Sequence, residues 1–111
     1  MTAFTLDPKP TFKLTVEIPV PGESFAPVEF TCKYRNRADL VALTGQVIGD
    51  AEKGVSGLSD ADTVKAIVEG WSLSDPCTPE NLAKLAGNYP GAASAIYLAY
   101  LDELLKVRRK N

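Results

Sequence analysis

The chain has 111 residues, a length that suits one domain and is too short for two well-packed ones. Hydrophobic residues make up 45% of it and charged residues 23%, an ordinary globular composition that argues against complete disorder. Its net charge of −2 excludes the generally basic surface that dominates nucleic-acid affinity. The sequence has no histidine, so the usual neutral-pH general base and the commonest zinc ligand are absent.

The longest apolar run, residues 92–101, is far shorter than the stretch of about 18 or more that a membrane span needs. Lys9 and Pro10 interrupt any signal-peptide core. We therefore expect no membrane segment and a reducing compartment, where Cys32 and Cys77 stay free. Cys32 is expected in the core. Cys77 stands at a helix entrance that would lower its pKa, but no basic partner makes it catalytic.

Two alternating segments predict an antiparallel β-hairpin within residues 11–34, preceded by a loose arm at residues 1–10. The apolar faces are Phe12, Leu14, Val16 and Ile18 in residues 11–18, and Val28, Phe30, Cys32 and Tyr34 in residues 28–34. Between the two strands, Pro21 and Gly22 suit a type II turn. Pairing Ile18 directly with Val28 would set like charges opposite each other, so we predict a register offset by two residues.

Helical periodicity predicts about four helices in residues 36–110, the last one longest. The first begins at Arg37, capped by Asn36 or Asp39, with the stripe Leu40, Leu43, Val47 and Ile48; a flexible loop, 50–58, follows it. The second begins at Ser59 and ends near Gly70, and the third is capped by Thr78 with Pro79 in its first turn. The last spans residues 91–110 and ends in Arg108, Arg109 and Lys110, which suit a negative helix end. The predicted fold is α+β, in a single domain over residues 1–111.

No combination of residues in the sequence points to catalysis. A nucleophile elbow, a phosphate-binding glycine loop and metal-ligand spacings are all missing. Asp50 and Glu52 resemble the start of a calcium loop, but Gly54 and Ala61 stand where oxygen ligands are required. We therefore predict no catalytic, cofactor or metal site and no small-molecule substrate. A small enzyme with carboxylates assembled in a deep pocket is kept as an alternative.

The last helix is apolar on nearly every side over residues 92–101, so it lies either at the centre of the core or under another chain. The second alternative predicts partner contacts through Tyr97, Tyr100 and Leu101, or through the opposite face of the helix, because aromatic side chains are favoured at interfaces. Trp71, the only tryptophan, is either a core anchor or a further partner contact. The hairpin edges either stay solvated or accept a strand from a second subunit.

The second half of the chain also carries an ordered set of residues typical of one protein family. They are Ile67-Val68-Glu69-Gly70-Trp71, Asp75, Thr78-Pro79-Glu80-Asn81-Leu82, Leu85, Tyr89-Pro90, Ala93, Ile96, Tyr100 and Arg109-Lys110-Asn111. With them, residues 64–111 resemble the tail assembly chaperones of long-tailed bacteriophages. The hairpin is similar to the extended start of these proteins, though less specifically.

The resemblance implies a non-enzymatic protein that binds and solubilises the aggregation-prone tape measure protein during tail morphogenesis. It implies action in the cytoplasm of the infected bacterial host and absence from the mature virion. It also implies self-association and, in many members, a longer product of a programmed ribosomal frameshift. The rival interpretation is a small phage or bacterial interaction protein that binds and modulates a host protein.

Overall fold

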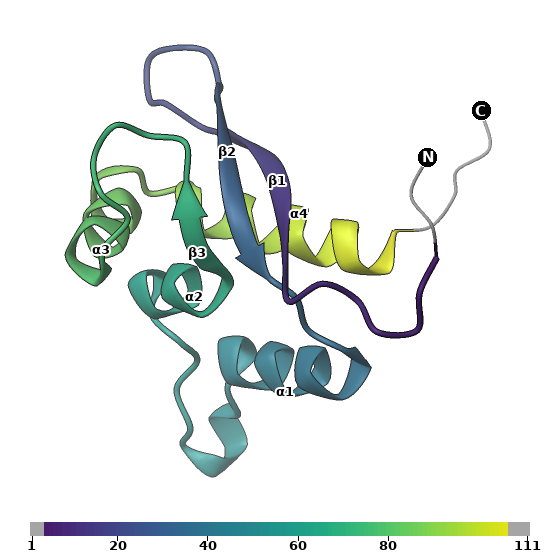
Figure 1. Cartoon of the computed structure of the whole chain (residues 1–111). Helices are drawn as coiled ribbons and strands as arrows, with labels where there is room; N and C mark the ends of the chain where they lie inside the picture. Colours follow the sequence, from purple (N-terminus) through teal and green to yellow (C-terminus); the bar gives the residue numbers. More distant parts are fainter. Residues whose placement is uncertain (1–3, 107–111) are drawn as a thin grey trace, which may run out of the picture.

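The computed structural model describes residues 4–106 and contains one three-stranded antiparallel sheet and four α-helices (Figure 1). The strands are β1 (Thr11–Ile18), β2 (Ala26–Lys33) and β3 (Val68–Trp71), in the order β1-β2-β3. The helices are α1 (Arg37–Ile48), α2 (Asp60–Ile67), α3 (Pro79–Asn88) and α4 (Ala92–Leu105). The predicted α+β class, with a hairpin first and the longest helix last, is confirmed.

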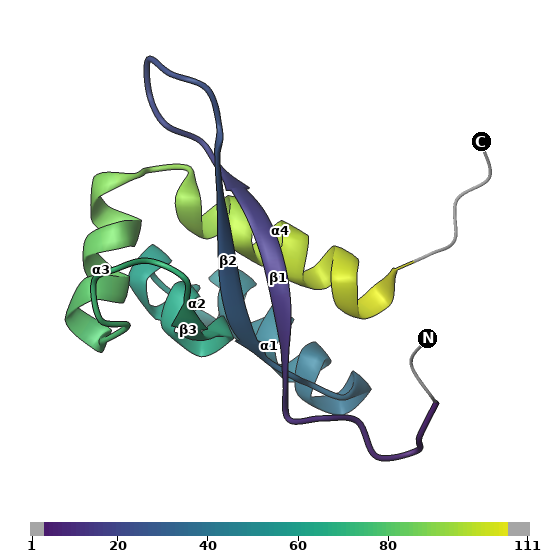
Figure 2. The same ribbon diagram turned by 45° about the horizontal axis from the view of Figure 1, so that its top comes forward.

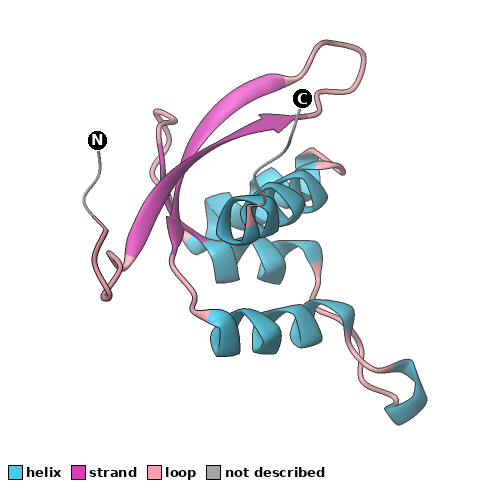
Figure 3. Cartoon of the chain, turned by 90° about the vertical axis from the view of Figure 1, so that its right-hand side faces the viewer, coloured by secondary structure: helices cyan, strands magenta, loops and turns pink. Residues whose placement is uncertain are grey.

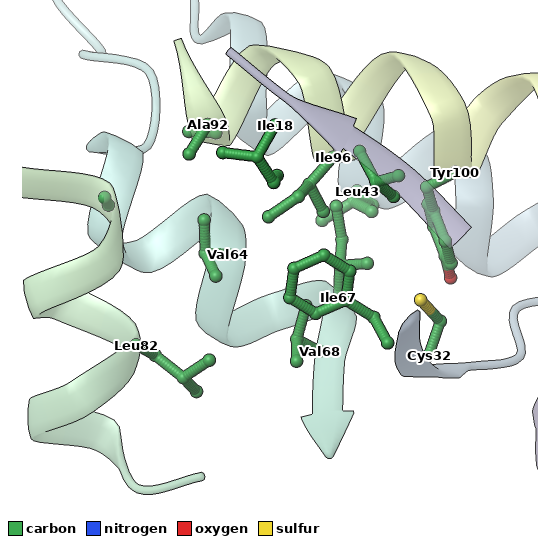
Figure 4. Close-up of a cluster of buried hydrophobic side chains, with 14 of the residues drawn as sticks. Ile18, Cys32, Leu43, Val64, Ile67, Val68, Leu82, Ala92, Ile96 and Tyr100 are labelled. Carbon is green, nitrogen blue, oxygen red and sulfur yellow. The ribbon is translucent and has the colours of Figure 1, made fainter. Parts of the chain in front are cut away.

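The strands lie on one side of the molecule and the helices on the other (Figure 3). Helix α4 crosses the back of the hairpin, as Figure 2 shows, while α2 lies beside it behind β2. The side chains between these layers form one continuous core (Figure 4). Its largest fully buried members are Tyr100, Phe30, Ile67, Ile96, Val64 and Cys32.

The hairpin has the predicted register. Val16 lies opposite Val28 and Thr15 opposite Glu29, which separates the like charges. Lys13 Nζ then lies 3.8 Å from a carboxylate oxygen of Glu29 on the same outer face. At the tip, the predicted type II turn forms. Gly22 has a φ of 80°, and the Glu23 amide donates to the Val20 carbonyl at 3.0 Å.

The second strand differs from the prediction at both ends. It begins at Ala26 and stops at Lys33, so Tyr34 lies beyond it. The Tyr34 amide still donates to the Pro10 carbonyl at 2.8 Å, but the chain then turns toward Asn36 and the Tyr34 ring is exposed. The predicted place of Tyr34 on the inward face is therefore wrong.

The third strand was not predicted. The expected helix through Gly70 ends at Ile67, and the next four residues pair with β2, with Phe30 opposite Trp71. A β-branched and an aromatic residue fit a pleated surface well, and pairing satisfies the backbone of β2 on that side. The hairpin therefore has one long unpaired edge in residues 4–106, that of β1.

The starts of the helices follow the predicted capping chemistry. The side chains of Asn36, Ser59 and Thr78 accept hydrogen bonds from amides three residues on, at 2.9, 3.1 and 3.2 Å. Asn36, not Asp39, is thus the cap of α1. Helix α4 ends earlier than predicted, at Leu105, with Lys106 outside it. The basic cluster Arg108, Arg109 and Lys110 lies outside the described residues.

The loop 50–58 is more regular than predicted. It contains a short 3₁₀ helix, Ala51–Lys53, and a β-bridge between Asp50 and Val55. The Leu58 amide donates to the Gln46 carbonyl at 3.0 Å, which holds the returning chain against the end of α1.

Candidate partner-binding surface

Tyr100, predicted to contact a partner, is fully buried. Its ring stacks on Phe12 with the ring centroids 5.9 Å apart. Its hydroxyl donates to the Lys33 carbonyl at 2.6 Å and accepts from Nη1 of Arg35 at 3.1 Å. Burial raises the pKa of the Tyr100 hydroxyl, and Arg35 partly opposes that shift. Tyr100 therefore joins α4 to the hairpin, on the side of α4 that faces the sheet, and it is not part of the exposed surface of this helix.

The other three predicted residues are half-buried: Tyr97 and Leu101 lie one turn apart on α4, whereas Trp71 lies in β3. Trp71 is held in β3, where its indole N–H donates to the Asp75 carbonyl at 2.7 Å and its ring tilts against Phe30. Tyr97 and Leu101 belong to α4, and burial raises the pKa of the Tyr97 hydroxyl. Trp71 lines a pocket of about 300 Å³ beside α3, on the opposite side of the molecule from the end of α4 (Figure 1).

Leu101 lines an apolar groove of about 310 Å³ between α1 and the end of α4. A larger cleft of about 770 Å³ lies between the N-terminal arm, the start of β1 and the end of α4. Tyr34 and Leu104 line both. We call the two together the α1–α4 surface. Its exposed or half-buried apolar side chains are Phe4, Leu6, Phe12, Tyr34, Val41, Leu101, Leu104 and Leu105.

Several of these side chains are strongly exposed: Phe4 and Leu6 by 90%, Val41 by 65% and Leu105 by 53%. Sequence reasoning missed Val41 because it assigned α1 a single apolar stripe, and it missed Phe4 and Leu6 because it treated residues 1–10 as a loose arm. The signal was available in α1, where Val41 lies outside the stripe of Leu40 and Leu43. Ile48, predicted in that stripe, is exposed as well. Helix α1 thus buries only two apolar side chains and shows others to solvent.

The rim of the α1–α4 surface is richer in cations than the rest of this acidic chain. Lys9 and Lys13 line the cleft, and Arg35 and Arg37 line the groove. Glu103 is the one carboxylate among the lining residues, and it pairs with Lys106 at 2.9 Å. Complementary charge favours and orients protein association, so the surface suits a partner with an apolar stripe and acidic flanks.

The Cys, Asp and Glu side chains do not cluster in the part of the chain that the structure describes. No group of three or more Cys, Asp or Glu side chains there is placed to hold a metal ion, and no helix there is long and apolar enough to cross a bilayer. Cys32 is buried in the core as predicted, and burial raises its pKa to about 11. Burial also raises the pKa of Cys77, so the expected lowering at the helix entrance is wrong.

The two thiols should therefore differ in reactivity. In the native protein at pH 8, we expect a disulfide reagent to modify the half-buried Cys77 first and Cys32 only as the chain opens. Denaturant should make both react at once. Mass spectrometry of the modified peptides measures the order, and equally fast native labelling of Cys32 would contradict its place in the core.

Exposed apolar side chains that gather on one surface often mark a site for another protein. The family model described as phage tail assembly chaperone matches residues 1–111, the whole chain. The chain therefore belongs to the phage tail assembly chaperone family, and the resemblance seen in its second half is confirmed. No curated protein and no solved structure matches it.

Proposed function

We propose that this chain is a non-enzymatic chaperone that binds the tape measure protein and keeps it soluble during tail morphogenesis. It acts in the cytoplasm of the infected host and does not remain in the mature virion. Self-association and a longer frameshift product belong to the same proposal. The observation that supports it best, beside family membership, is the exposed apolar α1–α4 surface with its cation-rich rim.

The proposed mechanism is the burial of apolar client surface. An amphipathic client helix lays its apolar stripe along Val41, Leu101 and Leu105, and its acidic residues meet the cations of the rim. Each apolar side chain that becomes fully buried contributes about 1.5–3 kcal/mol. Tyr97, half-buried on the same helix, contributes at the margin of this contact. Trp71 forms a second, separate contact beside α3.

The test is co-expression with the tape measure protein. Val41→Ser with Leu105→Ser is expected to weaken binding of the tape measure protein by more than tenfold, because the loss of two such contacts exceeds the value of about 1.4 kcal/mol that a tenfold change in Kd represents. Both side chains are exposed, so the free energy of unfolding should change by about 0.5 kcal/mol or less.

The matched control is Leu98→Ser, because Leu98 is also an exposed leucine of α4, 63% accessible, but lies outside the α1–α4 surface. This variant should bind the client like the parent chain. The proposal fails if the tape measure protein is equally soluble and unbound with and without the chain. A stoichiometric complex with a host protein in its place would favour the rival interpretation.

A further inference from the structure

The outer edge of β1 is a long strand edge without a partner among residues 4–106. β1 has eight residues, contains no proline and pairs with β2 without a bulge. The opposite edge, β3, has only four residues and a register irregularity where it meets β2. Proteins normally protect their sheet edges with short strands, charged side chains, prolines or bulges. β3 is short and irregular, whereas β1 is long and regular and carries only the charges of Lys13 and Glu17.

The backbone groups on this edge belong to the odd-numbered residues. The Tyr34 amide donates to the Pro10 carbonyl, so this pair is a hydrogen-bonded one. Hydrogen-bonded pairs recur at every second residue of an antiparallel ladder. The backbone N–H and C=O groups of the even-numbered residues of β1 therefore bond to β2. The N–H and C=O groups of Thr11, Lys13, Thr15 and Glu17 therefore point away from β2.

We propose that two copies of the chain pair through β1, antiparallel, with Thr15 opposite Thr15 across a two-fold axis. In this register Lys13 of each copy lies opposite Glu17 of the other, which gives two oppositely charged cross-strand pairs. Moving the centre to Lys13 or Glu17 would set like charges against each other. Centres at Leu14 or Val16 leave both charges opposite uncharged residues.

The pairing would extend the sheet and the Lys13–Glu29 ion pair that each copy already has. A two-fold axis perpendicular to the sheet keeps both apolar faces on one side, so two three-stranded sheets become one of six strands. Lys13 would lie between Glu29 of its own copy, at 3.8 Å, and Glu17 of the other. The end of α4 extends past β1 (Figures 1 and 2), on the side where the second copy would lie.

The first experiment measures the mass of the whole chain, free of any client, by light scattering over a range of concentrations. We expect twice the chain mass of 11.9 kDa. Thr15→Pro removes an outward N–H that β2 does not use, so it should give a folded monomer. Glu17→Lys should weaken the dimer at least tenfold, because it sets lysines against each other. Glu69→Lys makes the same charge change on β3 and should leave the dimer intact.

The second experiment tests the register in a Cys77→Ser background. Thr15→Cys should form a disulfide-linked dimer under mild oxidation, because directly opposed residues have Cα atoms close enough for the bond. Glu17→Cys should not, because Lys13 lies opposite it.

A monomer at every concentration, or a dimer that survives both Thr15→Pro and Glu17→Lys, would overturn the proposal. Equal cross-linking of the two cysteine variants would overturn the register. Because no client is present, these outcomes are independent of whether the tape measure protein binds.

Discussion

Replacing Tyr100 with alanine is expected to destabilise the fold by about 3–5 kcal/mol, the usual cost of deleting a large buried side chain. The ring is fully buried against Phe12, and its hydroxyl bonds to the Lys33 carbonyl and to Arg35. The substitution removes the contact that fixes α4 on the hairpin. Since a domain of this size has only about 5–15 kcal/mol of stability, much of it would be lost.

Urea unfolding followed by circular dichroism measures this effect. Tyr100→Phe separates the ring from the hydroxyl: it keeps the packing and should cost only about 0.5–1.5 kcal/mol for the lost hydrogen bond. Tyr97→Ala, on the half-buried side of the same helix, should cost less than Tyr100→Ala. Similar midpoints for Tyr97→Ala and Tyr100→Ala would show that α4 does not dock through Tyr100.

The contrast between Tyr97 and Tyr100 also shows what the sequence could not determine about α4. A helix that is apolar on nearly every side has no polar face to orient it, so periodicity alone does not say which side meets the sheet. In the structure, Ala92, Ala93, Ile96 and Tyr100 face inward and Leu98 and Leu105 outward. The position of the hairpin decides which side of α4 is buried, and that position depends on residues far from α4 along the chain.

Features set by neighbouring residues were predictable. The helix caps depend on side chains three residues from the amides they satisfy, and the type II turn depends on Pro21 and Gly22. The hairpin register followed from charges on two adjacent strands. β3 was missed for the opposite reason: four residues carry little signal, and their conformation depends on pairing with β2, about 40 residues away along the chain.

The candidate site was predictable only in part. The sequence indicated an apolar partner-binding region within residues 92–101 of the last helix, and Leu101 does line the α1–α4 surface. Val41 and the arm residue Phe4 lie on the same surface because the chain turns at Tyr34, directly after β2. The position of that turn depends on the residue at which β2 ends, and the alternating apolar pattern of the sequence did not predict that residue.

The second large effect is expected where the chain returns past the end of α1. A Cβ atom added to Gly57 would meet the carbonyl oxygen of Val47 below contact distance, and that oxygen is backbone that a side-chain rotation cannot move. Gly57→Ala should therefore push the returning segment away from α1, weakening the Leu58–Gln46 hydrogen bond. Overpacking of this kind typically costs about 1–3 kcal/mol, and we expect the upper part of that range.

Gly45→Ala is the matched control, because Gly45 lies inside α1 with open space around its Cα. Here alanine should stabilise the protein by about 0.5–1 kcal/mol through its higher helix propensity. A lower urea midpoint for Gly57→Ala and a higher one for Gly45→Ala would support the close approach of Gly57 to the Val47 carbonyl. An unchanged midpoint for Gly57→Ala would contradict it. Since α1 forms one wall of the α1–α4 groove, Gly57→Ala should also reduce recovery of the tape measure protein, whereas Gly45→Ala should leave it unchanged.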